Sequence, residues 1–263
     1  MKKTLIITLF TIISLICSGQ DGGPLKFLGI PIDGTEAQFV SKLKNKGFTY
    51  NTLTEGYKGQ FNGKPVDVYI HTNHNVVDRV YVAFPYTTEE SIRNEFNRLL
   101  GQFQNTEKYM DLVMNEEIPE SEDISYEITV NNKRYQASLS YFDPNRDPVA
   151  FMDALLDKFS EFFSDEQIAK LKEYIEKTID APEDQREALQ SEMMAEMHKM
   201  WMRQDENGTP DEEEAFRFIT TFLDGMRKLA DGEVWFMIHE HYGRYQIGLY
   251  YDNLHNQAHG EDL

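Results

Sequence analysis

Residues 61–84 read FNGKPVDVYIHTNHNVVDRVYVAF, and this stretch decides the fold class. The pair Asn62-Gly63 tolerates the positive φ angles of a two-residue hairpin turn. After it, apolar and polar residues alternate on both sides of a second turn at 72–75. Alternating apolar residues share one face of each strand: Val66, Val68 and Ile70 on the first, and Val80, Val82 and Phe84 on the second. The stretch therefore predicts an antiparallel meander over residues 48–85.

A helix is predicted on each side of this meander. Thr35 has the chemistry of an N-cap, Phe39 and Leu43 fall on one helical face, and Gly47 stands where a glycine ends a helix. The second helix covers about 89–103, where large apolar residues recur at helical spacing.

The second half of the chain combines hairpins with a long helical segment. A second hairpin is predicted over 124–142, with its turn at Asn131-Asn132, and a last one over 233–252. Between them, residues 148–230 follow a helical pattern. Start signals for its helices are Asp147-Pro148, the capping box that begins at Ser164, and Pro182.

These elements predict an α+β fold. Antiparallel hairpins and a meander form a sheet that helices cover on one side, with a helical segment inserted before the last hairpin. We expect a single domain over 20–263, with possible sub-units 20–146 and 147–263.

The motif Arg134-Tyr135-Gln136 recurs as Arg244-Tyr245-Gln246. The recurrence suggests a duplicated hairpin; the alternative is two ordinary hairpins of similar composition. In the last hairpin, the second strand face is also largely apolar, with Trp235, Met237 and Tyr250. A strand that is apolar on both faces needs cover on both. We expect the helices of 148–230 to pack near Trp235 and Met237.

The N-terminus has the pattern of a signal peptide. Two lysines follow Met1, residues 4–16 carry no charge, and cleavage after Gly19 would follow a small residue. This predicts a signal peptide over 1–19 and a periplasmic or secreted protein. The alternative is a lipoprotein anchored through Cys17. The lipidation motif prefers Leu at −3 and a small residue at −1, whereas Ser14 and Ile16 stand there.

Composition excludes some partners. Cys17 is the one cysteine, so the mature chain can form no internal disulfide, and the formal net charge is −19. Such a surface repels phosphate backbones and anionic lipids, so we expect no nucleic-acid partner and no membrane insertion once the signal is removed.

The most unusual local run surrounds His198. On a helix, Met193, Met197 and Met200 form one stripe, and His198 lies beside it. Thioethers and imidazole suit Cu(I), so Met193, Met197, His198 and Met200 are candidate copper ligands. The alternative is that flexible methionines fill a helix interface.

Two other residue sets could carry function. His239 and His241 share one strand face and could begin a zinc site, although a solvated hairpin end explains them and no further ligand can be placed. The strand tyrosines could form an aromatic platform for sugars or a protein partner, or they could belong to the core. Those tyrosines are Tyr126, Tyr135, Tyr141, Tyr245, Tyr250 and Tyr251, with Tyr250 the best candidate.

Both ends of the chain carry recognisable motifs. The run from Phe27 to Thr35, FLGIPIDGT, and the endings Tyr250–Asn253 and Gly260–Leu263 resemble a group of uncharacterised exported proteins of gut bacteria. The resemblance implies export and transfers no catalytic residue. The helix-then-meander start is also similar to small periplasmic binding modules of the lactamase-inhibitor type, an analogy of fold.

No nucleophile elbow, phosphate loop or dinucleotide motif occurs in the sequence. The leading hypothesis is therefore an exported, non-enzymatic binding or protein-interaction module for an unknown protein or small ligand, with no cofactor. The alternatives are a periplasmic copper-handling protein and a hydrolase whose residues are scattered in the sequence.

Overall fold

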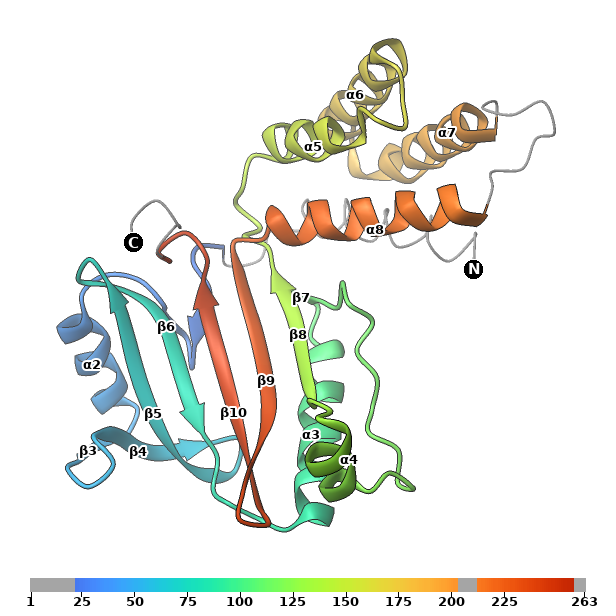
Figure 1. Ribbon diagram of the computed structural model, residues 1–263. Coiled ribbons are helices and arrows are strands. Elements are labelled where there is room, and N and C mark those ends of the chain that lie inside the picture. Colours follow the sequence, from blue (N-terminus) through green and yellow to red (C-terminus); the bar gives the residue numbers. More distant parts are fainter. Residues whose placement is uncertain (1–21, 203–211, 258–263) are drawn as a thin grey trace. The chain divides into compact units, whose positions relative to one another are not determined.

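The computed structural model describes residues 22–202 and 212–257 (Figure 1). Its contacts divide the chain into two compact units. Among the described residues, 23–143 and 230–257 form the first, which we call the sheet unit. Residues 144–202 and 212–229 form the second, the helical unit. The last hairpin is part of the sheet unit. The single domain predicted over 20–263, with possible sub-units 20–146 and 147–263, stays a prediction.

The sheet unit is built on eight antiparallel strands, in the order β3-β4-β5-β6-β10-β9-β8-β7. Their bounds are β3 Thr49–Asn51, β4 Gly56–Phe61, β5 Lys64–Asn73, β6 Val76–Ala83, β7 Tyr109–Met110, β8 Gln136–Tyr141, β9 Gly232–His241 and β10 Arg244–Asn253. A small separate sheet pairs β1, Lys26–Phe27, with β2, Ile30–Pro31. The predicted α+β class with an antiparallel sheet is confirmed.

The predicted meander is present as β3 to β6. Asn62 and Gly63 have φ angles of 52° and 77°, and the turn between β5 and β6 places His74 and Asn75 at 48° and 65°. Both turns therefore have the left-handed geometry that tight hairpins require. Val68 on β5 and Val80 and Val82 on β6 face the core and are fully buried.

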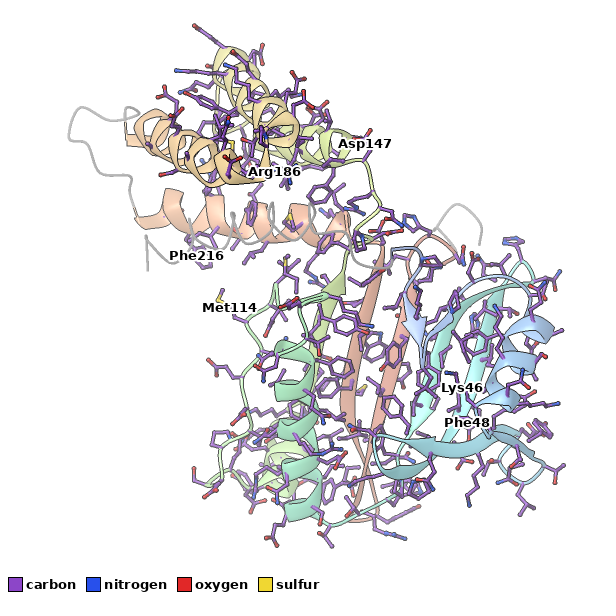
Figure 2. The ribbon with its side chains drawn as sticks, turned by 180° about the vertical axis from the view of Figure 1, so that it is seen from behind. Lys46, Phe48, Met114, Asp147, Arg186 and Phe216 are labelled. Atoms are coloured by element: carbon purple, nitrogen blue, oxygen red, sulfur yellow. The ribbon has the colours of Figure 1, made fainter. Side chains whose placement is uncertain are left out.

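Helices α2, Glu36–Asn45, and α3, Glu89–Gln104, cover one face of the sheet. Figure 2 is seen from their side, with α3 in front of the strands. Thr35 is the N-cap of α2, as predicted, and forms a capping box with Gln38; Thr88 caps α3. Aromatic contacts join helix to sheet, since the ring centroids of Phe96 and Phe236 lie 4.9 Å apart. Both predicted helices are confirmed.

The hairpin predicted over 124–142 is wrong. Residues Ile124–Asn131 form helix α4, and β8 follows it. The Asp123 side chain accepts a hydrogen bond from the Tyr126 N–H, and Asn132 ends the helix with a left-handed φ of 53°. Capping at both ends thus outweighs the β-branched residues of this segment. The proposed duplication of this hairpin at 233–252 falls with it.

A different pair of hairpins does correspond, β5–β6 and β9–β10. Tyr242 and Gly243 in the second turn have φ angles of 50° and 72°, like His74 and Asn75 in the first. One bulge at His71–Thr72 shifts the register of β5–β6 by a residue. When the bulge is allowed for, seven core-facing positions of one hairpin are equivalent to seven of the other, and all are apolar. The equivalent residues are Val66 and Val234, Val68 and Phe236, Ile70 and Ile238, Val77 and Tyr245, Val80 and Ile247, Val82 and Leu249, and Phe84 and Tyr251.

The helical unit contains α5 Pro148–Leu156, α6 Asp165–Asp180, α7 Glu183–Met202 and α8 Glu212–Lys228, with a 3₁₀ turn at Asp157–Phe159. The predicted caps at Asp147 and Ser164 are present. In the core of this unit, Phe159 stacks with Phe222 and contacts the tilted ring of Phe218. None of the helices in the described part of the chain has both the length and the apolar composition that a membrane span requires.

Candidate binding surface

Four aromatic residues form one row across the sheet, on the face opposite α2 and α3, which we call the second face. Tyr69 on β5 lies opposite Tyr81 on β6, Tyr81 opposite Tyr250 on β10, and Tyr250 opposite Trp235 on β9. Because cross-strand neighbours point to the same side of a sheet, all four rings stand side by side. We refer to them as the aromatic row.

The rings of the row stack on one another. Ring centroids are 5.5 Å apart for Tyr69 and Tyr81, 4.7 Å for Tyr81 and Tyr250, and 3.8 Å for Tyr250 and Trp235. The corresponding interplanar angles are 24°, 22° and 5°. All four side chains are half-buried. Each inner ring therefore packs against two others while keeping part of its surface exposed.

Two glycines make room for the row. A Cβ atom at Gly56 would lie 2.9 Å from Cε1 of Tyr69, and one at Gly248 would lie 2.9 Å from Cε2 of Tyr81 and 2.7 Å from Nε2 of His239. Those separations are shorter than van der Waals contact, so a side chain at either position would displace the ring that now covers it.

A polar network fixes one end of the row. Arg79 donates from Nε and Nη2 to the two carboxylate oxygens of Asp252, at 2.6 and 2.8 Å. Trp235 donates from Nε1 to the same carboxylate at 2.9 Å. The guanidinium of Arg79 lies 5.9 Å from the Trp235 ring centroid and 5.8 Å from that of Tyr250. Asp252 is 3% exposed, so three hydrogen bonds compensate a buried charge.

Burial shifts the pKa values of two groups in the row and of a neighbour. It raises the pKa of Tyr81 and that of Tyr250, and both phenols are protonated at neutral pH. It lowers the pKa of His239, whose Nε2 lies 3.5 Å from the Tyr250 hydroxyl. At neutral pH the row is thus uncharged, with hydroxyl groups that can donate or accept hydrogen bonds.

The two corresponding hairpins differ on this face. Where β6 carries Tyr81, β10 carries Gly248, and where β10 carries Tyr250, β6 carries Ala83. Trp235 on β9 corresponds to Asp67 on β5. The core-facing positions are apolar in both hairpins, whereas the second face is aromatic at different positions in each. Packing of the core therefore does not account for the aromatic row.

The predicted aromatic platform is present in part. Tyr250 belongs to the row, but Tyr135, Tyr141, Tyr245 and Tyr251 are buried in the core, as the alternative had it. Tyr126 is 53% exposed on α4. Tyr69, Tyr81 and Trp235 were not among the residues predicted for the platform. The alternation of side chains along a strand could have identified them, because it places each of them on the face opposite to that of the core-facing valines.

The candidate copper ligands lie on α7. Met193 is 2% exposed and lines an apolar pocket of the helical unit with residues that include Met152, Phe159 and Phe222. The side chains of Met197, His198 and Met200 lie outside what the structure describes, so the copper site stays a prediction. Within the described residues, no three His, Cys, Asp or Glu side chains gather as metal ligands.

The expected cover of Trp235 and Met237 by the helices of 148–230 also stays a prediction. It concerns the placement of one unit on the other, which the structure does not determine. Within the sheet unit, the described helices α2, α3 and α4 direct their buried apolar side chains to the core face.

Comparison with known proteins adds no relative: no family model, curated protein or solved structure matches this chain.

Proposed function

We propose that this protein is a non-enzymatic protein-interaction module that binds its partner through the second face of the sheet. The aromatic row carries the proposal. Tyr, Trp and Arg are the residues that dominate the binding energy of protein interfaces, and here Tyr81, Tyr250, Trp235 and Arg79 adjoin one another on one face.

The geometry supports a protein partner over a sugar. A sugar ring binds by lying on an aromatic face. Tyr250, however, has one ring neighbour on each side, at 4.7 and 3.8 Å. The inner rings thus present edges and hydroxyl groups, which suit a surface that interleaves side chains and hydrogen bonds. Stacking and the Asp252 network also hold the rings in place, which reduces the entropy lost on binding.

The test compares two tyrosine variants of the full chain, each tagged and expressed in the native host. Tyr250→Ala removes an inner ring of the row, and Tyr126→Ala removes an exposed ring on α4 as the matched control. We expect proteins recovered with the wild type to be retained by Tyr126→Ala and reduced at least about tenfold by Tyr250→Ala, a typical hot-spot effect. Equal recovery with both variants, both shown to be folded by circular dichroism, contradicts the proposal.

We further propose that the module acts outside the cytoplasm, after removal of residues 1–19. The basic start and the uncharged stretch at 4–16 support it. N-terminal sequencing of the mature protein is expected to begin at Gln20. A lipidated N-terminus at Cys17, or an intact Met1, would each contradict this cleavage.

A further inference from the structure

The aromatic row brings side chains that can be oxidised into contact with one another. Indole and phenol rings each give up one electron to a radical oxidant. The rings of Trp235 and Tyr250 are nearly parallel, at 5°, with centroids 3.8 Å apart, which is van der Waals contact. Tyr81 continues the stack at 4.7 Å from Tyr250. An electron that moves along these rings therefore has no gap to cross.

The Tyr250 phenol has a proton acceptor beside it. A phenol that loses an electron becomes strongly acidic, so its oxidation is favoured where a base takes the proton. Nε2 of His239 lies 3.5 Å from the Tyr250 hydroxyl, which is long for a hydrogen bond but usual for a base before it reacts. Burial lowers the pKa of His239, so the imidazole is neutral at neutral pH, and its Nδ1-protonated tautomer accepts this proton.

The two rings differ in what happens to the proton when they are oxidised. Trp235 donates from Nε1 to Asp252 at 2.9 Å, but both oxygens of that carboxylate already accept from Arg79. The oxidised indole therefore keeps its proton and carries a positive charge in a half-buried place, which is unfavourable. The oxidised phenol of Tyr250 becomes neutral when its proton moves to His239, and an imidazolium is the more stable cation. The oxidation is thus more stable at Tyr250 than at Trp235.

We infer that the aromatic row is a redox relay, which takes a one-electron oxidising equivalent from a small radical oxidant at Trp235 and passes it to Tyr250. The oxidant gains one electron from the indole of Trp235. One electron from Tyr250 then restores the indole, and the phenol proton bonds to Nε2 of His239. The products are the reduced oxidant, a neutral phenoxyl radical at Tyr250 and a protonated imidazole. This activity goes beyond the proposed function, although it uses the same rings.

The experiment uses the purified protein with Trp201→Phe, which leaves Trp235 as the single tryptophan. Pulse radiolysis of an azide solution generates azidyl radicals, which oxidise indole in preference to phenol. The absorbance of the indole radical and that of the phenoxyl radical are recorded with time. We expect the first to decay as the second grows, at a rate that does not change with protein concentration, because the transfer occurs within one molecule.

Two substitutions test the electron donor and the proton acceptor. Tyr250→Phe keeps the ring but removes the phenol, and is expected to slow the transfer at least about tenfold, because the next phenol lies farther from Trp235. His239→Gln keeps a polar side chain but removes the base, and is expected to slow the transfer at least about tenfold. Tyr126→Phe, which removes an exposed phenol on α4, is the matched control and is expected to leave the rate unchanged.

Two outcomes overturn the inference. One is an unchanged transfer rate in Tyr250→Phe or in His239→Gln, with the variant shown to be folded by circular dichroism. The other is a transfer rate proportional to protein concentration, because the electron would then come from another molecule. Either result leaves the proposed function standing, since that function is tested by the recovery of partners with Tyr250→Ala. Loss of that dependence, in turn, leaves the relay standing.

Discussion

At the scale of single residues, Gly248 has the clearest structural requirement. Its backbone lies beneath the Tyr81 ring and the His239 imidazole, and the structure has no space there for a methyl group. Its φ angle is not in the left-handed region, so the demand is for space and not for backbone freedom. Because Gly248 lies on β10 against these rings, its small size allows the rings of the second face to lie close to the strand.

Gly248→Ala is expected to destabilise the protein by about 1–3 kcal/mol, the usual cost of overpacking, and to move Tyr81 out of the row. Urea denaturation measures the first effect, and near-ultraviolet circular dichroism measures the second. Gly101→Ala on α3 is the control, since a Cβ there meets nothing within 4 Å, and it is expected to stabilise by up to about 1 kcal/mol. Unchanged stability and spectrum in Gly248→Ala would show that the rings have room to move.

His239 gives the row a dependence on pH. Burial lowers its pKa below the ordinary value of 6.5, so between these two values the unfolded chain binds more protons than the folded one. Stability contributed by this residue therefore rises with pH in that window, and is lost as the pH falls below about 6.5. We expect His239→Gln to flatten the pH dependence of the unfolding free energy below about pH 6.5. Parallel curves for the two proteins across this range would contradict the assignment.

At the scale of elements, β8 shows how a sheet edge is closed without a full strand. β7 pairs only with Tyr141 and Ser140, which leaves the outward groups of Ser138 without a strand partner. The side chain of Asn115 supplies one: Oδ1 accepts from the Ser138 N–H at 3.1 Å and Nδ2 donates to the Ser138 carbonyl at 2.9 Å. The carboxylate of Asp111 holds Asn115 in position. An exposed edge that could recruit another chain is thereby blocked.

Asn115→Ala is expected to cost about 1–3 kcal/mol, because two backbone groups lose their partners. Hydrogen exchange at the Ser138 amide should speed up, and dilution experiments should detect self-association through the freed edge. Asn51→Ala is the control, since its side chain accepts one hydrogen bond, from Leu53 in an exposed turn. If Ser138 exchanges as slowly as in the wild type, Asn115 does not protect the edge.

At the scale of the whole molecule, the chain leaves the sheet unit for the helical unit, and returns to it, at two neighbouring positions of the sheet. Tyr141 at the end of β8 lies opposite Gly232 at the start of β9. The Asp231 carboxylate binds the Asp143 N–H at 2.5 Å and His255 at 2.8 Å. Both ends of the insertion are therefore fixed by the sheet unit itself.

We expect replacement of residues 144–229 by a short Asn-Gly turn to leave a folded sheet unit, because the two chain ends are already adjacent. A single cooperative thermal transition and a retained Tyr250–Trp235 signal in near-ultraviolet circular dichroism would bear this out. A truncated chain without secondary structure would show that the sheet depends on the insertion. Removal of β9 and β10 instead, which takes Phe236 and Leu249 from the core, is expected to abolish folding.

Local signals sufficed for much of the architecture. Caps at Thr35, Asp147 and Ser164 and the Asn62-Gly63 turn act within a few residues, so the sequence predicts them well. Helix α4 was missed because Ile124, Ile128 and Val130 favour strands, and capping decided otherwise. The aromatic row depends on β6 pairing with β10, segments some 170 residues apart, and no local pattern specifies that register.

The insertion between β8 and β9 has a consequence for how this protein could change in evolution. Because Tyr141 and Gly232 remain neighbours whatever lies between them, the intervening segment can lengthen, shorten or be exchanged at little entropic expense. The sheet would keep its register through such changes. New specificity could then be acquired in the inserted segment while the ring-bearing face of the sheet stays as it is.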